Sequence, residues 1–517
     1  MGTSASRRLF LRTAAGVLVA APYVCRFPRA AASDARFDPS YGTASQALRA
    51  IRSGAISSRE LIELTYKRIK TYNPIINAFI TLREEEALKE AKEADEALVK
   101  GISLGRLHGL PIVVKDLRAT AGIRTTYGSK KYENYVPKED DLAVARLRRA
   151  GAIIIGKTNT PEFGADYQTF NDVAGLTKNP WDPTRSPGGS TGGGAAALAA
   201  GIGFLEIGSD LGGSIRNPAH FCGIYGHKPT FDLVPRTGPR PPGAAIASRD
   251  NQWVNGPLAR SAQDLQLELE VTAGHDPSDA VAYGWKLPPA RGTRLKDYRI
   301  GFVLSDPFCP PSSEVAEVVT RAVEAMRSHG AQINEGWPKG IDFPKVFEDY
   351  YFLLVNNWYQ KEEDLRKRID SLKGKDDYYS VLVTKALSAS YQQWRVRDGA
   401  RLEVRAIWRE YFREHDAFIM PVNFCAAFPH AQQKDWNERA IETIDGKRTY
   451  RDLARWVTMP TFSGCPATVA PAGRTQQGLP VGIQIMGPYL EDATPIHIAG
   501  LISDILGGFT PPPGYST

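Results

Sequence analysis

Two glycine-rich turns lie close together in residues 185–230, and each holds serines among its glycines. The first turn reads GGSTGGG at 188–194 and runs into an alanine-rich segment at 195–200, and the second reads GSDLGGS at 208–214. Glycine permits backbone angles and close contacts that a Cβ atom forbids, whereas alanine has the highest helix propensity. We therefore expect the first turn to open a helix, and the second to present bare backbone N–H groups beside Ser214.

These turns have two simpler interpretations, and neither fits. A phosphate-binding loop of the form GxxxxGK followed by Ser or Thr needs a lysine, and no lysine follows either turn closely enough. A flexible Gly/Ser linker would lack the apolar and alanine-rich runs that flank the turns. We favour a nucleophile loop, in which Ser214 attacks a carbonyl and nearby N–H groups bind the developing oxyanion.

The block resembles the amidase signature family in the stretches GGSTGGGAAALAAG and GSDLGGSIRNPAHFCGIYGHKPT. That family uses a Ser–cis-Ser–Lys triad, and the resemblance implies that Ser214 is the nucleophile, Ser190 the bridging serine and Lys115 the base. Ser190 lies 24 residues before Ser214, and Lys115 lies 75 residues before Ser190. Thr191 stands where the family usually has a second serine. Because threonine keeps the hydroxyl, we expect Thr191 to adjust the activity without abolishing it.

Lys115 ends the apolar stretch LPIVVKD at 110–116, which predicts a short buried strand. A buried lysine is costly unless it is paired or neutral, and burial lowers its pKa toward the range that a general base requires. Taken alone, this residue would more simply be a snorkelling lysine or an ion pair with Asp116. Its spacing from Ser190 favours the base.

The second turn supplies the remaining predicted site residues. We expect the backbone N–H groups of Leu211, Gly212 and Gly213, with that of Ser214, to form the oxyanion hole. Asp210 is expected to orient the loop and Arg216 to brace it. Neither a cofactor nor a metal is expected, because the histidines form no HExxH motif and the cysteines fit no zinc spacing.

Helix and strand patterns alternate through most of the chain and predict an α/β fold. A helical pattern at 140–150 precedes an apolar strand at 152–156, and 256–261 is expected to start another helix. Such alternation implies a sheet covered by helices on both faces, and the resemblance implies a large mixed central sheet of the amidase-signature type. No linker separates independent domains, so residues 33–517 are predicted to form a single amidase domain.

Residues 1–32 read as a twin-arginine signal peptide. The pattern SRRLFLR at 6–12 precedes an apolar stretch at 13–24 and a small-residue site at 30–32. Removing this segment takes away five arginines and no acid, which lowers the formal net charge from +7 to +2. We therefore expect a periplasmic or secreted protein with no stable membrane anchor after signal removal and no nucleic-acid partner.

These observations favour an exported amidase that cleaves a small-molecule amide through a serine acyl-enzyme, with some esterase activity. Aryl acylamides, carbamates and oligoamides are the expected substrates, and a homodimer is left open. One alternative is a glutamine-hydrolysing amidotransferase subunit. The other is a non-catalytic binding protein on an amidase scaffold, against which the intact triad positions argue.

Overall fold

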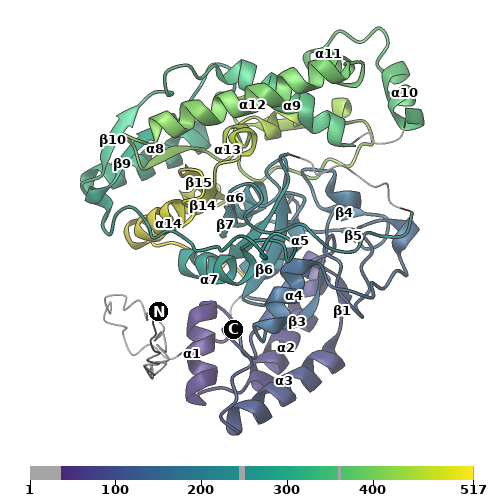
Figure 1. The fold of residues 1–517 in the computed structure, drawn as a ribbon, viewed down its shortest axis with the longest axis vertical. Coiled ribbons are helices and arrows are strands. Elements are labelled where there is room, and N and C mark those ends of the chain that lie inside the picture. The colour runs from purple at the N-terminus through teal and green to yellow at the C-terminus, as the bar shows by residue number, and fades with distance from the viewer. Residues whose placement is uncertain (1–36, 244–250, 359–361, 516–517) are drawn as a thin grey trace, which may run out of the picture. The chain divides into compact units, whose positions relative to one another are not determined.

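The centre of the protein is a mixed sheet, and one of its inner strands runs directly into the second glycine-rich turn (Figure 1). In spatial order its eleven strands are β1 (Phe79–Leu82), β3 (Ile153–Thr158), β2 (Pro111–Lys115), β6 (Leu205–Asp210), β8 (Val254–Ala259), β7 (Tyr225–Lys228), β14 (Ala467–Arg474), β15 (Pro480–Met486), β11 (Ala417–Pro421), β9 (Arg299–Phe302) and β10 (Gln332–Glu335). Strands β3, β2 and β6 run parallel, as do β11, β9 and β10, and the other pairs are antiparallel. The predicted large mixed sheet is confirmed.

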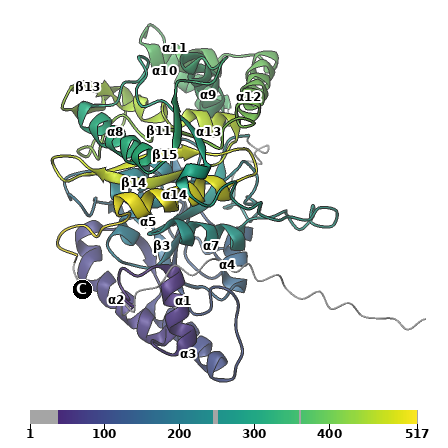
Figure 2. The same cartoon turned by 90° about the vertical axis from the view of Figure 1, so that its left-hand side faces the viewer.

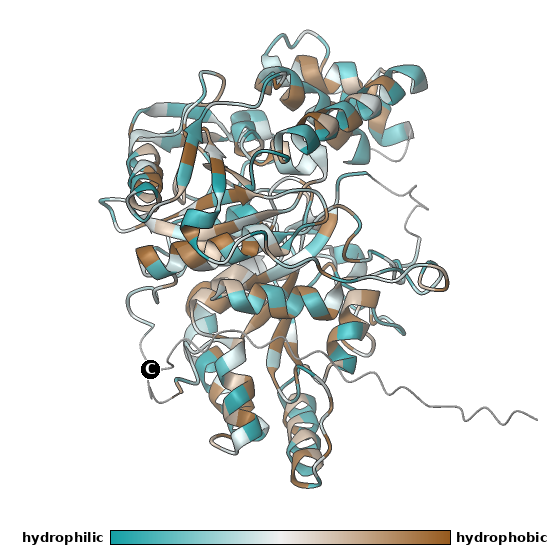
Figure 3. Ribbon diagram, turned by 60° about the vertical axis from the view of Figure 1, so that its left-hand side comes forward, coloured by the Kyte–Doolittle hydropathy of each residue, from teal (hydrophilic) through white to brown (hydrophobic). Residues whose placement is uncertain are grey.

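Helices cover both faces of this sheet, as predicted (Figure 2). One group consists of α2 (Ser58–Ile76), α3 (Glu84–Val99), α5 (Gly192–Ala199) and α6 (Arg216–Cys222). The other consists of α1 (Ala44–Ser53), α4 (Leu142–Arg149), α7 (Ala262–Thr272), α8 (Ser313–Ser328) and α14 (Ala493–Leu506). Hydrophobic residues concentrate along the central strands between these layers (Figure 3), because strands buried on both faces have no solvent-exposed side.

A further group of helices lies beyond one end of the sheet and packs on itself (Figure 1). Its members are α9 (Phe343–Trp358), α10 (Glu362–Ser371), α11 (Tyr378–Leu387), α12 (Tyr391–Tyr411) and α13 (Thr458–Ser463). Phe347 and Tyr350 of α9 are fully buried in one large aromatic cluster. Tyr351, Phe352 and Tyr379 are buried with them and form helix core, whereas Tyr378 and Tyr391 are exposed.

Short elements connect these layers. They are the hairpin strands β4 (Phe170–Asn171), β5 (Gly175–Leu176), β12 (Ala440–Thr443) and β13 (Gly446–Thr449), and the 3₁₀ turns η1 (Lys130–Tyr132), η2 (Glu162–Gly164), η3 (Leu295–Asp297), η4 (Trp436–Glu438) and η5 (Tyr450–Ala454). The segment from η4 to η5 faces the nucleophile turn across the aromatic cluster, so it contributes to the site described below.

Helix α5 begins at Gly192, within the first glycine-rich turn, so this turn opens a helix as predicted, and every residue of the helix is buried. Glycine and alanine have no side chains long enough to keep a neighbour away, so this helix packs closely on the sheet. Gly189 shows how tight the preceding turn is: a Cβ there would lie 2.5 Å from the backbone oxygen of Gln168. The peptide bond between Gly189 and Ser190 is cis.

The prediction of a helix start at 256–261 is wrong. Residues up to Ala259 belong to strand β8, which pairs antiparallel with both β6 and β7. Helix α7 starts only at Ala262, where the side chain of Ser261 accepts a hydrogen bond from the N–H of Asp264. The strand is buried on both faces, so its sequence lacks the alternation of polar and apolar residues that would have revealed it.

The computed structural model describes residues 37–243, 251–358 and 362–515. From Asp38 onward these residues belong to one compact unit. The predicted signal peptide at 1–32 lies outside the described residues and stays a prediction. Within the described ranges, every helix is too short or too polar to cross a bilayer, and the four cysteines, Cys222, Cys309, Cys425 and Cys465, are buried free thiols.

Candidate active site

Lys115 is the centre of the candidate site. It ends strand β2, is completely buried, and points its amine at hydroxyl groups from both glycine-rich turns. The Nζ atom lies 2.7 Å from Ser190 Oγ, 2.9 Å from Thr191 Oγ1 and 3.2 Å from Ser209 Oγ. The structure therefore brings the predicted base and the predicted bridging serine into hydrogen-bond distance across 75 residues of sequence.

The surroundings of this amine favour its neutral form. Burial lowers the pKa of Lys115 well below its ordinary value, and the nearby Arg118 guanidinium lowers it further. The carboxylates of Glu206 and Asp210 act in the opposite direction but do not outweigh these two effects. Three hydroxyl neighbours offer hydrogen bonds without a compensating charge, so the amine can serve as a proton acceptor near neutral pH.

Ser214 lies in the turn between strand β6 and helix α6, and only 8% of its surface is exposed. Its carbonyl oxygen accepts a hydrogen bond of 3.1 Å from the N–H of Thr191. This bond joins the second glycine-rich turn to the first, directly after Ser190. The predicted nucleophile and the predicted bridging serine thus belong to two turns that are hydrogen-bonded to each other.

Asp210 and Arg216 form hydrogen bonds and an ion pair on the inner side of the nucleophile turn. The Asp210 carboxylate accepts hydrogen bonds from the N–H groups of Gly213, Ile215 and Arg216. The Arg216 guanidinium forms a two-point ion pair with it, at 3.0 Å through Nε and 2.8 Å through Nη2. Burial alone would raise the pKa of Asp210, but the Arg216 charge and hydrogen bonds hold it below its ordinary value.

The oxyanion hole differs from the prediction at one position. The N–H of Gly213 donates to Asp210 at 2.9 Å, so it is committed within the turn. Gly213 has a φ of 90°, a backbone conformation that favours glycine. The N–H groups of Leu211, Gly212 and Ser214 remain the proposed donors to an oxyanion.

Sequence analysis missed two groups that the structure brings to this site. Ser209 gives Lys115 a third hydroxyl partner, and its place within the second turn was the available signal. Tyr350 of α9 donates a hydrogen bond of 3.1 Å from its hydroxyl to the backbone oxygen of Leu211. Tyrosines are common in helix cores, so the sequence offered no sign that this one reaches the nucleophile turn.

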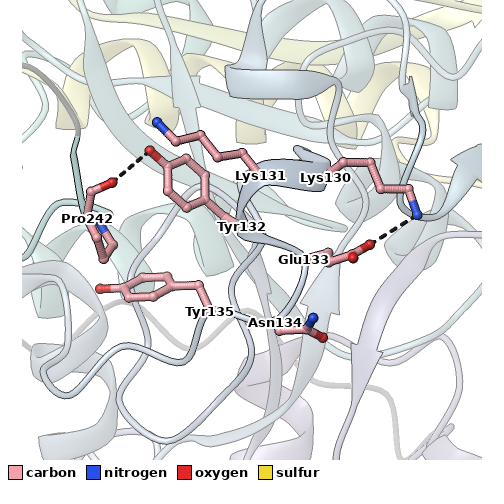
Figure 4. A pocket seen from close by; sticks show the side chains of 7 residues that line it. All are labelled: Lys130, Lys131, Tyr132, Glu133, Asn134, Tyr135 and Pro242. Carbon is pink, nitrogen blue, oxygen red and sulfur yellow. Dashed lines mark hydrogen bonds and ion pairs between the residues drawn. The ribbon is translucent and has the colours of Figure 1, made fainter.

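A hollow of about 510 Å³ elsewhere on the protein contains none of these groups (Figure 4). Its lining residues are Lys130, Lys131, Tyr132, Glu133, Asn134, Tyr135 and Pro242. The Tyr132 hydroxyl donates to the backbone oxygen of Pro242 at 3.1 Å, and Lys130 pairs with Glu133 at 3.1 Å. Its lining contains no serine or cysteine to act as a nucleophile, so we place the chemistry at Lys115 and the two turns.

Comparison with known proteins agrees with this geometry. The model of the family named Amidase matches residues 60–495. The chain belongs to the amidase family. A bacterial aryl acylamidase of the amidase signature enzymes has the same fold, with a TM-score of 0.76 over 90% of this chain and 97% of that one, at 24% identity.

Two other relatives are named as amidotransferase subunits. The A subunit of glutamyl-tRNA(Gln) amidotransferase from Thermus thermophilus is 35% identical over 86% of this chain and 92% of its own length. The crystal structure of the subunit of the same name from Thermotoga maritima superposes with a TM-score of 0.72 and 26% identity, over 92% of this chain and 98% of that one. The family and these relatives show an enzyme that acts on C–N amide bonds.

These relatives overturn the predicted main function. Curated proteins that are 32 to 35% identical to this amidase over most of its length are amidotransferase A subunits. The prediction of an exported amidase for aryl acylamides, carbamates or oligoamides is therefore wrong, and the alternative, a glutamine-hydrolysing subunit, is favoured. The triad motif indicates which type of bond is cleaved, but it does not indicate which acyl group the enzyme accepts. Other parts of the chain recognise the acyl group.

Proposed function

We propose that this amidase hydrolyses the side-chain amide of glutamine and releases ammonia, as the amide-cleaving subunit of an amidotransferase. Relatives of that name, which align over nearly their whole length, support the choice of substrate. The observation that carries the chemistry is the buried Lys115 amine, 2.7 Å from Ser190 Oγ, beside the turn that holds Ser214.

In the proposed first step, Ser214 Oγ attacks the amide carbon of the substrate. Its proton passes to Ser190 Oγ while the proton of Ser190 passes to neutral Lys115. The N–H groups of Leu211 and Gly212 stabilise the negative charge that develops on the carbonyl oxygen. The ion pair between Asp210 and Arg216 keeps these N–H groups in place, so no movement of the turn is needed during the reaction.

The second half of the reaction returns the proton. Lys115 gives its proton back through Ser190 to the leaving nitrogen, the C–N bond breaks, and ammonia departs. Water then attacks the ester formed on Ser214, with Lys115 and Ser190 again accepting a proton. The products are glutamate and ammonia, and the serine regains its hydroxyl proton.

The proposed partner is a second polypeptide that consumes the ammonia. The relatives carry the name of one subunit among several, so they are components of a larger assembly. A transfer reaction needs an acceptor for the ammonia, and the acceptor would be held by that partner. The homodimer that the sequence left open stays a prediction.

The test is ammonia release from glutamine by the purified full-length protein, measured together with glutamate formation. Turnover is expected for the wild type and should be lost in Ser214→Ala. An anilide and a neutral primary amide serve as comparison substrates. Failure to cleave glutamine, with efficient cleavage of the neutral amides, would contradict the proposal. Failure on every amide would instead favour a binding protein on an amidase scaffold.

A further inference from the structure

Four arginines lie between residues 439 and 455, and three of them pair with acids. Arg439 pairs with Asp166 at 2.7 Å. Arg448 and Arg455 both pair with Asp452, each at 2.9 Å. Each of these three guanidinium groups therefore contacts a carboxylate within the protein, with Arg448 and Arg455 sharing the one of Asp452.

The fourth, Arg451, is different. Only 6% of it is exposed, and its recorded hydrogen-bond acceptors are neutral: the hydroxyl of Tyr351 at 2.7 Å from Nη1 and the amide oxygen of Asn437 at 3.1 Å from Nε. No carboxylate in the described part of the chain lies within 4.0 Å of it, although Asp377 and Asp435 lie within the longer reach of its charge. A buried guanidinium without an anion in contact is costly, so this position is suited to an anion supplied by a ligand.

The aromatic cluster connects Arg451 to the nucleophile turn. The guanidinium lies over the ring of Trp436 at 5.3 Å, and the ring of Tyr167 is 5.4 Å from that of Trp436. Tyr167 in turn borders Gly212, since a Cβ on that glycine would lie 3.4 Å from its ring and 3.6 Å from its hydroxyl. Contacts through Tyr167 and Trp436 therefore lead from the proposed oxyanion hole to Arg451. We call these two rings and the guanidinium the aromatic wall.

Tyr167 adds a buried donor that, unlike Arg451, has no acceptor at all among the described residues. It is 4% exposed, and its hydroxyl has no hydrogen-bond partner among the described residues. Burial raises the pKa of Tyr167 well above its ordinary value, and the neighbouring Tyr350 and Tyr351 raise it further. The hydroxyl is therefore protonated at neutral pH and can donate. A buried donor without a partner is costly, so its presence beside the site is a second, independent sign of a ligand.

We propose that Arg451 and the hydroxyl of Tyr167 bind a carboxylate on the acyl part of the substrate, away from the amide that Ser214 attacks. The inference rests on the proposed function and sharpens it. Substrates should be amides whose acyl group carries an anion, of which glutamine is one. A neutral acyl group would leave the Arg451 charge uncompensated and would be discriminated against.

The test compares two amides of matched length in the full-length protein. Glutaramate carries a carboxylate at the end opposite its amide, and pentanamide carries a methyl group there. Arg451→Gln should lower kcat/KM for glutaramate by about 10- to 100-fold, mainly through KM, because it removes a charge-assisted hydrogen bond to the ground state as well as the transition state. For pentanamide the change should stay within about threefold.

Arg448→Gln is the matched control, because it removes an arginine from the same segment that already has an acid as its partner. It should affect both amides equally. A direct binding measurement covers the case of poor turnover: Ser214→Ala should bind glutarate in calorimetry, and the double variant with Arg451→Gln should bind it at least tenfold more weakly. Equal binding, or equal losses on both amides, would mean that Arg451 only supports the aromatic wall and would overturn the proposal.

The outcomes separate this inference from the proposed function. Cleavage of glutaramate but not glutamine, with the expected loss in Arg451→Gln, would keep the carboxylate site and reject glutamine as the substrate. Cleavage of glutamine that is unchanged in Arg451→Gln would keep the function and reject the site. Arg451→Lys should recover part of the preference for glutaramate, since it restores the charge without the planar two-point geometry.

Discussion

Replacing Lys115 with methionine removes an ionisable group at nearly constant side-chain length, and it should change how stability depends on pH. Burial, reinforced by Arg118, lowers the pKa of Lys115 well below its ordinary value in the folded protein. The unfolded chain keeps the proton up to about pH 10.4. Between these two pKa values the unfolded state binds one more proton, so stability rises with pH and is lost as pH falls toward the folded pKa.

The size of this pH effect on the free energy of unfolding follows from the binding of a single proton. The free energy of unfolding of the wild type should rise by about 1.4 kcal/mol per pH unit relative to Lys115→Met in this window. At pH 8, releasing a proton from a free lysine costs about 3 kcal/mol. The variant avoids this cost but loses three hydrogen bonds at about 1 kcal/mol each. The two proteins should therefore be similarly stable at pH 8, and the slope is the diagnostic quantity.

The assay is urea unfolding of both proteins, followed by tryptophan fluorescence at pH 7, 8 and 9. Lys157→Met is the matched control, because Lys157 is equally buried but lies 3.9 Å from Asp116, and burial lowers its pKa only to about 8. The stability difference between Lys157→Met and the wild type should change little with pH below pH 8, whereas that between Lys115→Met and the wild type should keep changing with pH there. A pH-independent difference for Lys115→Met would show that the folded protein keeps this proton, and the proposed base would be rejected.

Three further predictions concern the turns. Ser214→Ala should abolish amide hydrolysis with an unchanged circular dichroism spectrum, and turnover within tenfold of the wild type would reject it as the nucleophile. Asp210→Asn should lower the free energy of unfolding by about 3–5 kcal/mol, because it leaves the Arg216 charge buried without a partner; a loss under 1 kcal/mol in urea unfolding would contradict this. Gly189→Ala should lower kcat at least tenfold, because its Cβ would lie 2.5 Å from the backbone oxygen of Gln168 and displace Ser190; unchanged kcat would show that the turn can relax.

Much of the candidate site could be predicted from local patterns. The glycine-rich turns have a steric signature that depends only on neighbouring residues, and an apolar run that ends in lysine marks a buried strand. Helix α5 and strand β2 agree with these patterns, whereas the contact between Lys115 and Ser190 was expected from the family resemblance. The substrate could not be predicted in this way, and the first choice was wrong. The acyl group is recognised outside the motif, by residues whose types also occur in any helix core.

The sequence by itself determined the α/β class and the two serine-bearing turns, because each depends on sterics and hydrophobicity over a few residues. The choice of Lys115 as their partner came from the resemblance to the amidase signature family. Only the tertiary structure decided that Ser209 shares the Lys115 amine, that residues 254–259 form a strand, and that Tyr167 and Arg451 lie along one wall. Those facts depend on contacts between segments up to hundreds of residues apart. Such contacts exist only once the sheet and the aromatic cluster have packed, and no local pattern encodes them.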